Sequence, residues 1–270
     1  MQAILLMAFV LTGVGLSVWW PIYSLKRARL KPFPAHFSAI LEHNIAVYPR
    51  MPAALQQQLQ LLIKQFLHEK KFVGCDGLQV TDEVRVTIAA QACLLLLNRT
   101  PQIFPALSHI LVYPSAFVAP RNEIGIGGVV THADRSMAGE SWSDGRVILA
   151  WDHVKQGAMN FFDGHNVVLH EFAHQLDSEA GASNGAPWLP STAGYRRWAD
   201  VMSHEFAALQ QAAMFQTESV MDHYGATSPA EFFAVATETF YSRPQQLAEW
   251  HPALFDELKK YYRVDPRSWV

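Results

Sequence analysis

The chain has 270 residues; half of them are hydrophobic and only 17% are charged. This composition excludes a disordered protein and supplies enough apolar side chains for a core. The 21 basic and 24 acidic side chains give a net charge of −3, so no basic excess favours direct nucleic-acid binding. The two cysteines exclude a disulfide scaffold and a four-cysteine zinc site.

The amino-terminal segment has the composition of a membrane anchor. Residues 3–23 contain no charged side chain and are just long enough to cross a bilayer. Aromatic residues lie near their carboxyl end, and a basic cluster follows, made of Lys26, Arg27, Arg29 and Lys31. The positive-inside rule then predicts a single-pass helix in the inner membrane, with the rest of the chain in the cytoplasm. A cleaved signal peptide is one alternative, and a buried helix in a soluble cytoplasmic protein is another.

No internal repeat or Gly/Ser linker divides the remaining chain. We therefore predict three parts: a transmembrane anchor at 1–24, a basic juxtamembrane tether and lead-in at 25–52, and one domain at 53–270. Within that domain, leucines at helical spacing predict an amphipathic helix over residues 53–69. Residues 82–98 predict a second helix, which is more apolar and is expected in the core.

Strand patterns follow these helices. His109–Tyr113 is short, apolar and partly β-branched, and residues 124–131 form an apolar run with three glycines. Asp144-Gly145 precedes another apolar run and is typical of a hairpin turn. We expect a small, largely antiparallel sheet between about 108 and 151, and helices from there nearly to the end. The predicted fold class is α+β, mostly helical, with a small mixed or antiparallel sheet.

The segment from Asn166 to Asp177 contains the pattern His-Glu-x-x-His. On a helix, His170 and His174 lie one turn apart on one face, so both imidazoles can bind one metal ion. Glu171 projects about 100° away from His170 and can contact a water molecule held by that ion. Zinc lowers the pKa of such a water, and a carboxylate can take its proton during attack on a carbonyl. The motif therefore predicts one catalytic Zn²⁺ with Glu171 as general base.

Catalytic zinc usually has a third protein ligand, and no further histidine follows at close spacing. The segment from Ser228 onward supplies two carboxylates, Glu231 and Glu238, which share one helix face. Ser228 followed by Glu231 also fits a capping box, in which Glu231 would bond back to the backbone of Ser228. Spacing alone leaves both carboxylates open as the third ligand.

Four segments resemble a known family of bacterial zinc-dependent peptidases, the Mlc titration factor A family. This family is gluzincin-like and related in catalytic architecture to the anthrax lethal factor protease. The resemblance extends from about Gln58 to Asp265. Its matching segments are LVYPSAFV (111–118), GESWSDGRVILAW (139–151), HEFAHQLD (170–177) and DHYGATSPAEFFAVATETFY (222–241). It implies a zincin-like peptidase domain.

The resemblance also implies roles for individual residues. His170, His174 and Glu231 would be the zinc ligands and Glu171 the catalytic base. Tyr224 matches a family tyrosine proposed to lie beside the metal, where a phenol can donate a hydrogen bond to a developing oxyanion. The family's namesake binds the glucose repressor Mlc.

Two carboxylates are expected behind the ligands. Asp177 follows His174 by three residues and can accept the N–H of a ligand imidazole; a carboxylate on the helix surface is the alternative. Glu238 is the other expected support.

The sequence therefore predicts a zinc metallopeptidase that hydrolyses peptide or protein substrates, as an endopeptidase or an aminopeptidase. The alternative is a regulatory binding protein that sequesters a transcriptional repressor, with weak or vestigial peptidase activity.

Overall fold

The structure is a computed structural model that describes residues 19–20, 23–99, 102–124, 130–137, 139–142, 145–179, 181 and 183–269. The expected anchor at 1–24 lies almost wholly outside these residues. Among the residues that are described, no helix combines the length and apolar character needed to cross a membrane. The anchor therefore stays a prediction.

Helices make up most of the described chain. They are α2 (Ala35–Asn44), α3 (Ala53–Glu69), α4 (Asp82–Leu94), α5 (Trp151–Met159), α6 (Val167–Ser178), α7 (Thr192–Phe215), α8 (Pro229–Ser242), α9 (Pro244–Trp250) and α10 (Pro252–Tyr262), with short 3₁₀ turns η1 (Tyr48–Arg50), η2 (His223–Ala226) and η3 (Pro266–Trp269). The predicted helix over 53–69 is confirmed as α3. The one predicted over 82–98 begins at Asp82 but ends at Leu94, because the next residues form tighter i→i+3 turns that lead to Asn98 at a φ of 56°.

The main sheet has four strands in the order β1-β2-β6-β5. They are β1 (Lys71–Gly74), β2 (His109–Tyr113), β5 (Gly139–Trp142) and β6 (Arg146–Ala150). Both β1 and β6 pair with β2 in parallel, and only β5 runs antiparallel to its neighbour. The sheet is therefore mixed, as the predicted α+β fold class allows, but the expectation of a largely antiparallel sheet between about 108 and 151 was wrong. Strand β1 was missed because its four residues are too few to show alternation. It pairs in parallel with β2 through a crossover connection that contains α4.

A second, separate pair of strands consists of β3 (Phe117–Ile124) and β4 (Val130–Met137), which pair antiparallel. The predicted single strand over 124–131 was wrong, because Ile124 ends β3 and Val130 begins β4; residues 125–129 lie outside the described residues. The hairpin predicted at Asp144-Gly145 is confirmed by the antiparallel pairing of β5 with β6, although Asp144 itself lies outside the described residues.

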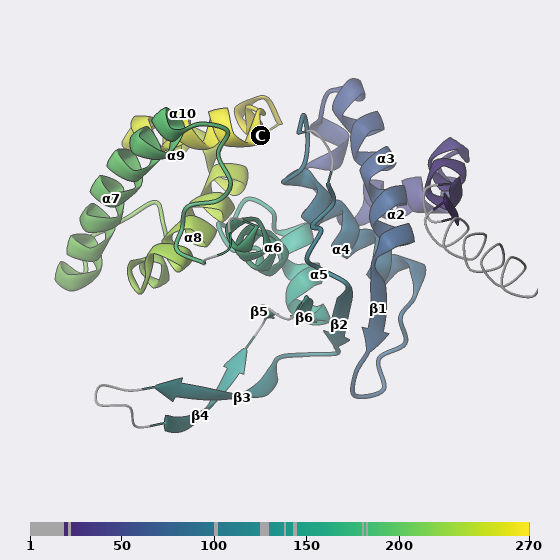
Figure 1. The fold of residues 1–270 in the computed structure, drawn as a ribbon, viewed down its shortest axis with the longest axis horizontal. Helices are drawn as coiled ribbons and strands as arrows, with labels where there is room; N and C mark the ends of the chain where they lie inside the picture. The colour runs from purple at the N-terminus through teal and green to yellow at the C-terminus, as the bar shows by residue number, and fades with distance from the viewer. Residues whose placement is uncertain are drawn as a thin grey trace, which may run out of the picture.

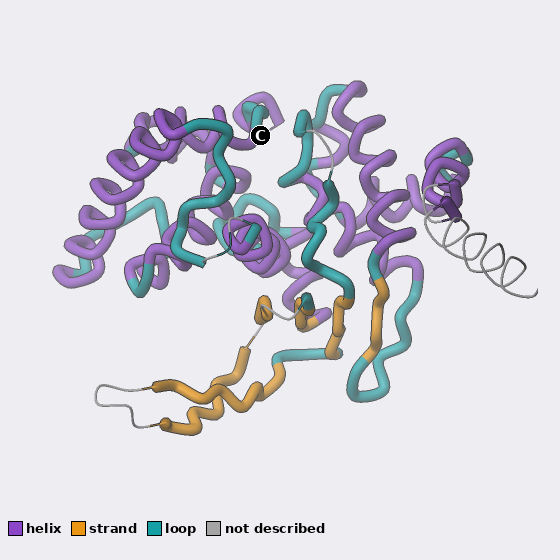
Figure 2. Tube along the Cα trace, in the orientation of Figure 1, coloured by secondary structure: helices purple, strands orange, loops and turns teal. Residues whose placement is uncertain are grey.

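Helix α6 lies at the centre of the molecule, between the group α7–α10 and the group α2–α4 (Figure 1). The strands lie together below the helices in this view, with β3 and β4 extending away from the rest (Figure 2). On α6, Leu169, Phe172 and Leu176 are fully buried. The ring of Phe172 packs 5.7 Å from Phe66 of α3 and 4.8 Å from Phe104. This packing fixes which face of α6 remains available for chemistry.

Candidate metal centre

The position of α6 is set by the residue just before it, the buried N-cap Asn166. Its Oδ1 accepts the N–H of Leu169 at 2.9 Å, and its Nδ2 donates to Gln91 at 2.8 Å and to the carbonyl of Gly157 at 3.0 Å. Asn166 therefore caps the helix and also ties it to α4 and α5. With the start of α6 fixed, the two histidines of the motif point to the same side.

Three ligand atoms converge at that side. Nε2 of His170 lies 3.2 Å from Nε2 of His174 and 3.0 Å from Oε2 of Glu231, and Nε2 of His174 lies 3.4 Å from the same carboxylate oxygen. Ligands about 2.0–2.1 Å from a tetrahedral zinc are about 3.3 Å apart. The donor set and its spacing therefore fit one zinc ion, and these residues form a group able to hold a metal.

Glu231 reaches the cluster from the first turn of α8. The backbone N–H of Glu231 donates to Oγ of Ser228, the N-cap of α8, at 3.2 Å. Its carboxylate faces the two imidazoles. Ser228 thus caps the helix as the pattern indicates, while the Glu231 carboxylate lies within reach of both imidazoles.

Glu238, two turns further along α8, lies behind His170. Its Oε1 is 2.7 Å from Nδ1 of His170, and its Oε2 accepts the N–H of Asn166 at 2.6 Å. A carboxylate on Nδ1 leaves Nε2 of the ring available to a metal. Glu238 therefore links the helix cap to the orientation of the imidazole.

Asp177 does not take the position that the sequence predicts. In the described part of the chain no hydrogen bond joins it to His174, and its Oδ2 accepts the N–H of Gly185 at 2.8 Å. The side chain is fully buried. Through this hydrogen bond, Asp177 holds the loop that follows α6.

Burial and neighbouring charges shift the pKa values of two carboxyl groups in the site. Burial raises the pKa of Glu171 to about 7, against the opposing effect of His170 and His174. The pKa of Glu231 is well below its usual range, because its hydrogen bonds to the two histidines outweigh burial. A lowered pKa favours the ionised form of Glu231, in which a carboxylate can bind a metal, and a pKa of about 7 would suit Glu171 to act as a general base.

The cluster opens into a pocket of about 390 Å³ whose walls include Glu171, Tyr224 and strand β5. Tyr224, on η2, is 46% exposed, and its ring centroid is 6.0 Å from that of His170. Gly139 of β5 packs directly on α6, since a Cβ there would lie 2.6 Å from Val167 and 2.8 Å from Glu171. The contribution of β5 was missed because nothing local in its sequence indicates this close approach.

Comparisons with known proteins identify the family of this chain. A family model described as glucose-regulated metallo-peptidase M90 matches residues 21–263. The uncharacterized protein slr2042 of Synechocystis sp. is 40% identical over 262 residues, covering 95% of each chain. Mlc titration factor A of Serratia proteamaculans is 32% identical over 220 residues (78% of this chain and 80% of the relative), and that of Yersinia pestis is 30% identical over 228 residues (83% of each). The chain therefore belongs to the M90 family of metallopeptidases.

Proposed function

We propose that this protein is a zinc-dependent peptidase with His170, His174 and Glu231 as metal ligands. The observation that carries the proposal is the convergence of these three side chains at the spacing of a tetrahedral zinc site. When bound, zinc would supply an activated water and polarise the carbonyl of the peptide bond. Membership of a metallopeptidase family supports the same activity.

The surrounding residues then have distinct tasks. Glu171 takes the proton of the attacking water and passes it to the leaving amine, for which its pKa of about 7 is suited. Tyr224 donates a hydrogen bond to the oxygen on which charge develops, so Tyr224→Phe should lower kcat about 10–1000-fold with zinc content unchanged. Strand β5 forms an edge of the sheet and offers backbone groups to an extended peptide.

Digestion of an unbiased peptide library tests the proposal and reports whether cleavage is internal or at the amino terminus. Glu171→Gln should keep stoichiometric zinc and lose hydrolysis, whereas His174→Ala should lose both. Glu249→Gln, the same change at an exposed position on α9, is the matched control and should retain both. Undiminished hydrolysis by Glu171→Gln would contradict the assignment of the base.

A second function is favoured by the name Mlc titration factor A that several relatives carry. We propose as the alternative that the chain sequesters an Mlc-like transcriptional repressor. Binding of purified Mlc to wild-type protein and to Glu171→Gln separates the two functions. Equal binding by both, together with no cleavage of any peptide, would favour the regulatory role alone.

For the amino-terminal segment, the proposal is a single-pass membrane anchor with the peptidase domain in the cytoplasm, and a protein without an anchor is the alternative. The uncharged run at 3–23 and the basic residues after it support this proposal. Full-length protein should remain with membranes after a high-salt wash, and a variant that begins at Lys31 should not. Recovery of the full-length chain in the soluble fraction would contradict the anchor.

A further inference from the structure

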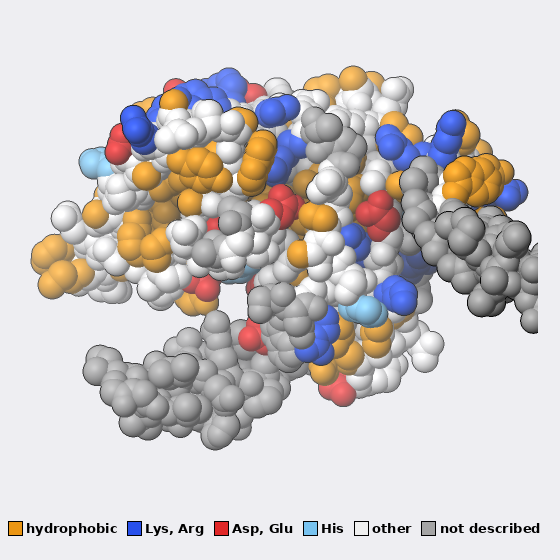
Figure 3. All heavy atoms as spheres, in the orientation of Figure 1, with side chains coloured by type: hydrophobic (Ala, Val, Ile, Leu, Met, Phe, Trp, Pro, Cys, Tyr) orange, Lys and Arg blue, Asp and Glu red, His pale blue; other side chains and the backbone are white. Residues whose placement is uncertain are grey.

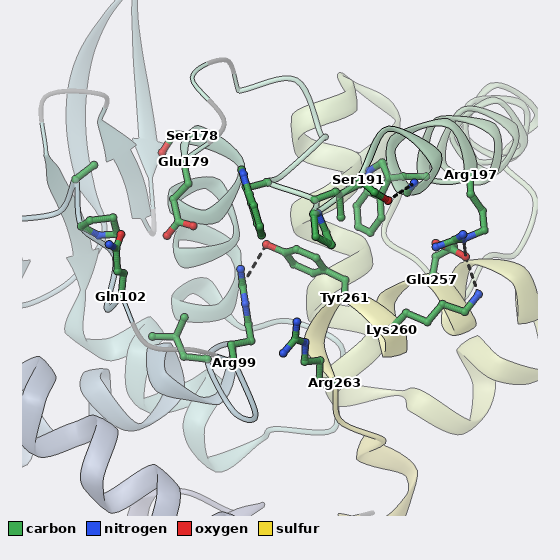
Figure 4. Close-up of a pocket in the computed structure, with 18 residues that line it drawn as sticks. Arg99, Gln102, Ser178, Glu179, Ser191, Arg197, Glu257, Lys260, Tyr261 and Arg263 are labelled. Carbon is green, nitrogen blue, oxygen red and sulfur yellow. Dashed lines mark hydrogen bonds and ion pairs between the residues drawn. The ribbon is translucent and has the colours of Figure 1, made fainter.

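A second cavity lies beyond the carboxyl end of α6 and is larger than the pocket at the metal centre. Its volume is about 730 Å³, within the range of small-molecule sites. Four segments form its walls: the end of α6, the turn after α4, the start of α7 and the end of α10. The side chains of Arg99, Glu179 and Tyr261 converge on it from three of these segments (Figure 4).

The cavity carries an excess of positive charge. Its charged side chains are Arg99, Arg197, Lys260, Arg263, Glu179 and Glu257. Arg197 and Lys260 both contact the same oxygen of Glu257, at 2.7 and 2.8 Å, so one carboxylate is shared by two cations. Lys and Arg side chains also gather over α10 and the start of α7 on the surface in Figure 3.

An aromatic wall lies next to these charges. The guanidinium carbon of Arg99 is 4.7 Å from the ring centroid of Tyr261, and its Nη1 lies 3.2 Å from the Tyr261 hydroxyl. The ring of Trp198 packs 5.4 Å from that of Tyr261, and Trp188 at the cavity is 57% exposed. Flat rings beside fixed guanidinium groups suit a ligand that has an apolar body and an anionic group.

Helix α7 begins at this cavity. Its N-cap Ser191 and Gly194 both line the wall, and the amino end of a 24-residue helix favours negative charge. Glu179 is the one acidic side chain of the cavity that has no hydrogen bond or ion pair among the described residues, and burial raises its pKa. For an anion bound in the cavity, the carboxylate of Glu179 would be repulsive and the guanidinium groups would be attractive.

We propose that this cavity binds a small organic anion, a carboxylate or a phosphate ester with an aromatic or other apolar body. Arg99 and Arg263 hold the anionic group through their guanidinium forks, and the aromatic wall holds the apolar body. The proposal does not depend on peptidase activity.

The cavity is also connected to the metal centre. Ser178 lines both, and Gly185 joins the elements behind them: Asp177 of α6 accepts its N–H, and Nε1 of Trp198 on α7 donates to its carbonyl at 2.9 Å. A Cβ on Gly185 would lie 2.3 Å from the carbonyl oxygen of Pro229, the first residue of α8. A ligand in the cavity therefore contacts the end of α6, which carries His170 and His174, and lies beside the loop that packs on α8.

Calorimetric titration of the full-length chain with phenyl phosphate and with benzoate tests the proposal and separates the two anion types. Inorganic phosphate and benzyl alcohol are the controls for the anionic group and the apolar body alone. At least one organic anion should bind saturably, more tightly than either control and less tightly as salt rises. No saturable binding of either anion, or equal binding of a control, would overturn the proposal.

Three variants place the binding in the cavity rather than at a metal ion. Arg263→Gln should weaken it about tenfold, as expected for loss of a charged hydrogen-bond donor. Arg196→Gln, an exposed arginine of α7 outside the cavity wall, should leave it unchanged. Glu179→Gln should tighten it severalfold because an opposing charge is removed. Equal effects of the two arginine variants, or no tightening by Glu179→Gln, would overturn the assignment to this cavity.

Discussion

At the scale of single residues, the two carboxylates of α8 that face His170 occupy different positions. Glu231 faces the Nε2 atoms of both histidines, whereas Glu238 contacts Nδ1 of His170 on the far side of the ring. The seven-residue spacing predicted that both would share a helix face. It left open which one is nearer to the metal, because that depends on how α8 packs against α6.

This difference predicts a ranking of variants. Glu231→Gln removes an anionic metal ligand and should lower zinc affinity by well over 100-fold. Glu238→Gln leaves the three proposed ligands in place but removes the negative charge beside Nδ1 of His170. It should therefore lower zinc affinity by about 10–100-fold. Competition with a chromogenic chelator measures both. The reverse order would mean that Glu231 is only a capping residue.

Glu179 predicts a pH dependence of stability. Burial raises its pKa above the ordinary 4.5, against the opposing effect of Arg99. The folded state then holds its proton to higher pH than the unfolded state does, so the contribution to stability is present below pH 4.5 and is lost as pH rises through the folded pKa. Glu179→Gln should raise Tm at pH 8 by about 1–2 °C.

The same variant should approach the Tm of the wild type near pH 4, where the wild-type carboxyl is mostly protonated in both states. Glu179 lies outside the metal centre, so the comparison can be made with zinc present throughout. A Tm difference that is constant across this pH range would contradict a titration of Glu179.

At the scale of elements, local patterns predicted those parts of the fold that local interactions determine. The helix over 53–69 and the strand His109–Tyr113 match α3 and β2. The His-Glu-x-x-His pattern predicted the two histidines on one face because four residues make one helical turn. The parallel strand β1 and the role of β5 could not be predicted, since both depend on neighbours distant in the sequence.

The contact made by Asp177 could likewise not be predicted from its local spacing. Its spacing from His174 was compatible with support of the imidazole, but its hydrogen bond is to Gly185. The loop that contains Gly185 lies between α6 and α7, and its path is set by contacts with α7 and α8. The cavity beside this loop could not be predicted from the sequence either, because its charged side chains come from separate segments of the chain.

A pair of glycine variants tests the contact between the Gly185 loop and the start of α8. Gly185 and Gly77 both have a φ of 78°, so alanine suffers the same backbone strain at either position. At Gly77 nothing lies within 4 Å of the new Cβ, whereas at Gly185 it would meet the Pro229 carbonyl at 2.3 Å. Gly77→Ala should cost about 1 kcal/mol of unfolding free energy and Gly185→Ala about 2–4 kcal/mol.

Denaturant titration measures the two unfolding free energies. Because Pro229 begins the helix that carries Glu231, Gly185→Ala should also lower zinc affinity, while Gly77→Ala should not. Equal costs for the two variants, with zinc affinity unchanged in both, would show that the loop adjusts without moving α8.

At the scale of the whole molecule, the metal centre depends on contacts among several elements. Helix α6 supplies two of the proposed ligands and the proposed base, α8 supplies the third proposed ligand, and β5 packs against Glu171. Asn166 and Glu238 join α4, α5, α6 and α8 behind the site. A metal ion in this position would link α6 to α8 in the folded state only, since about sixty residues of unfolded chain separate Glu231 from the two histidines.

Removal of the metal should accordingly lower the stability of the whole domain. A ligand that binds the folded state alone stabilises it by RT ln(1 + [L]/Kd), or about 4 kcal/mol at a concentration 1,000 times Kd. For a domain of this size, a strong chelator should then lower Tm by about 8–16 °C. The chelator should have little effect on His174→Ala, which already lacks the ion, and excess zinc should restore the wild-type Tm. An equal loss of Tm in His174→Ala would show that the chelator acts elsewhere than at this centre.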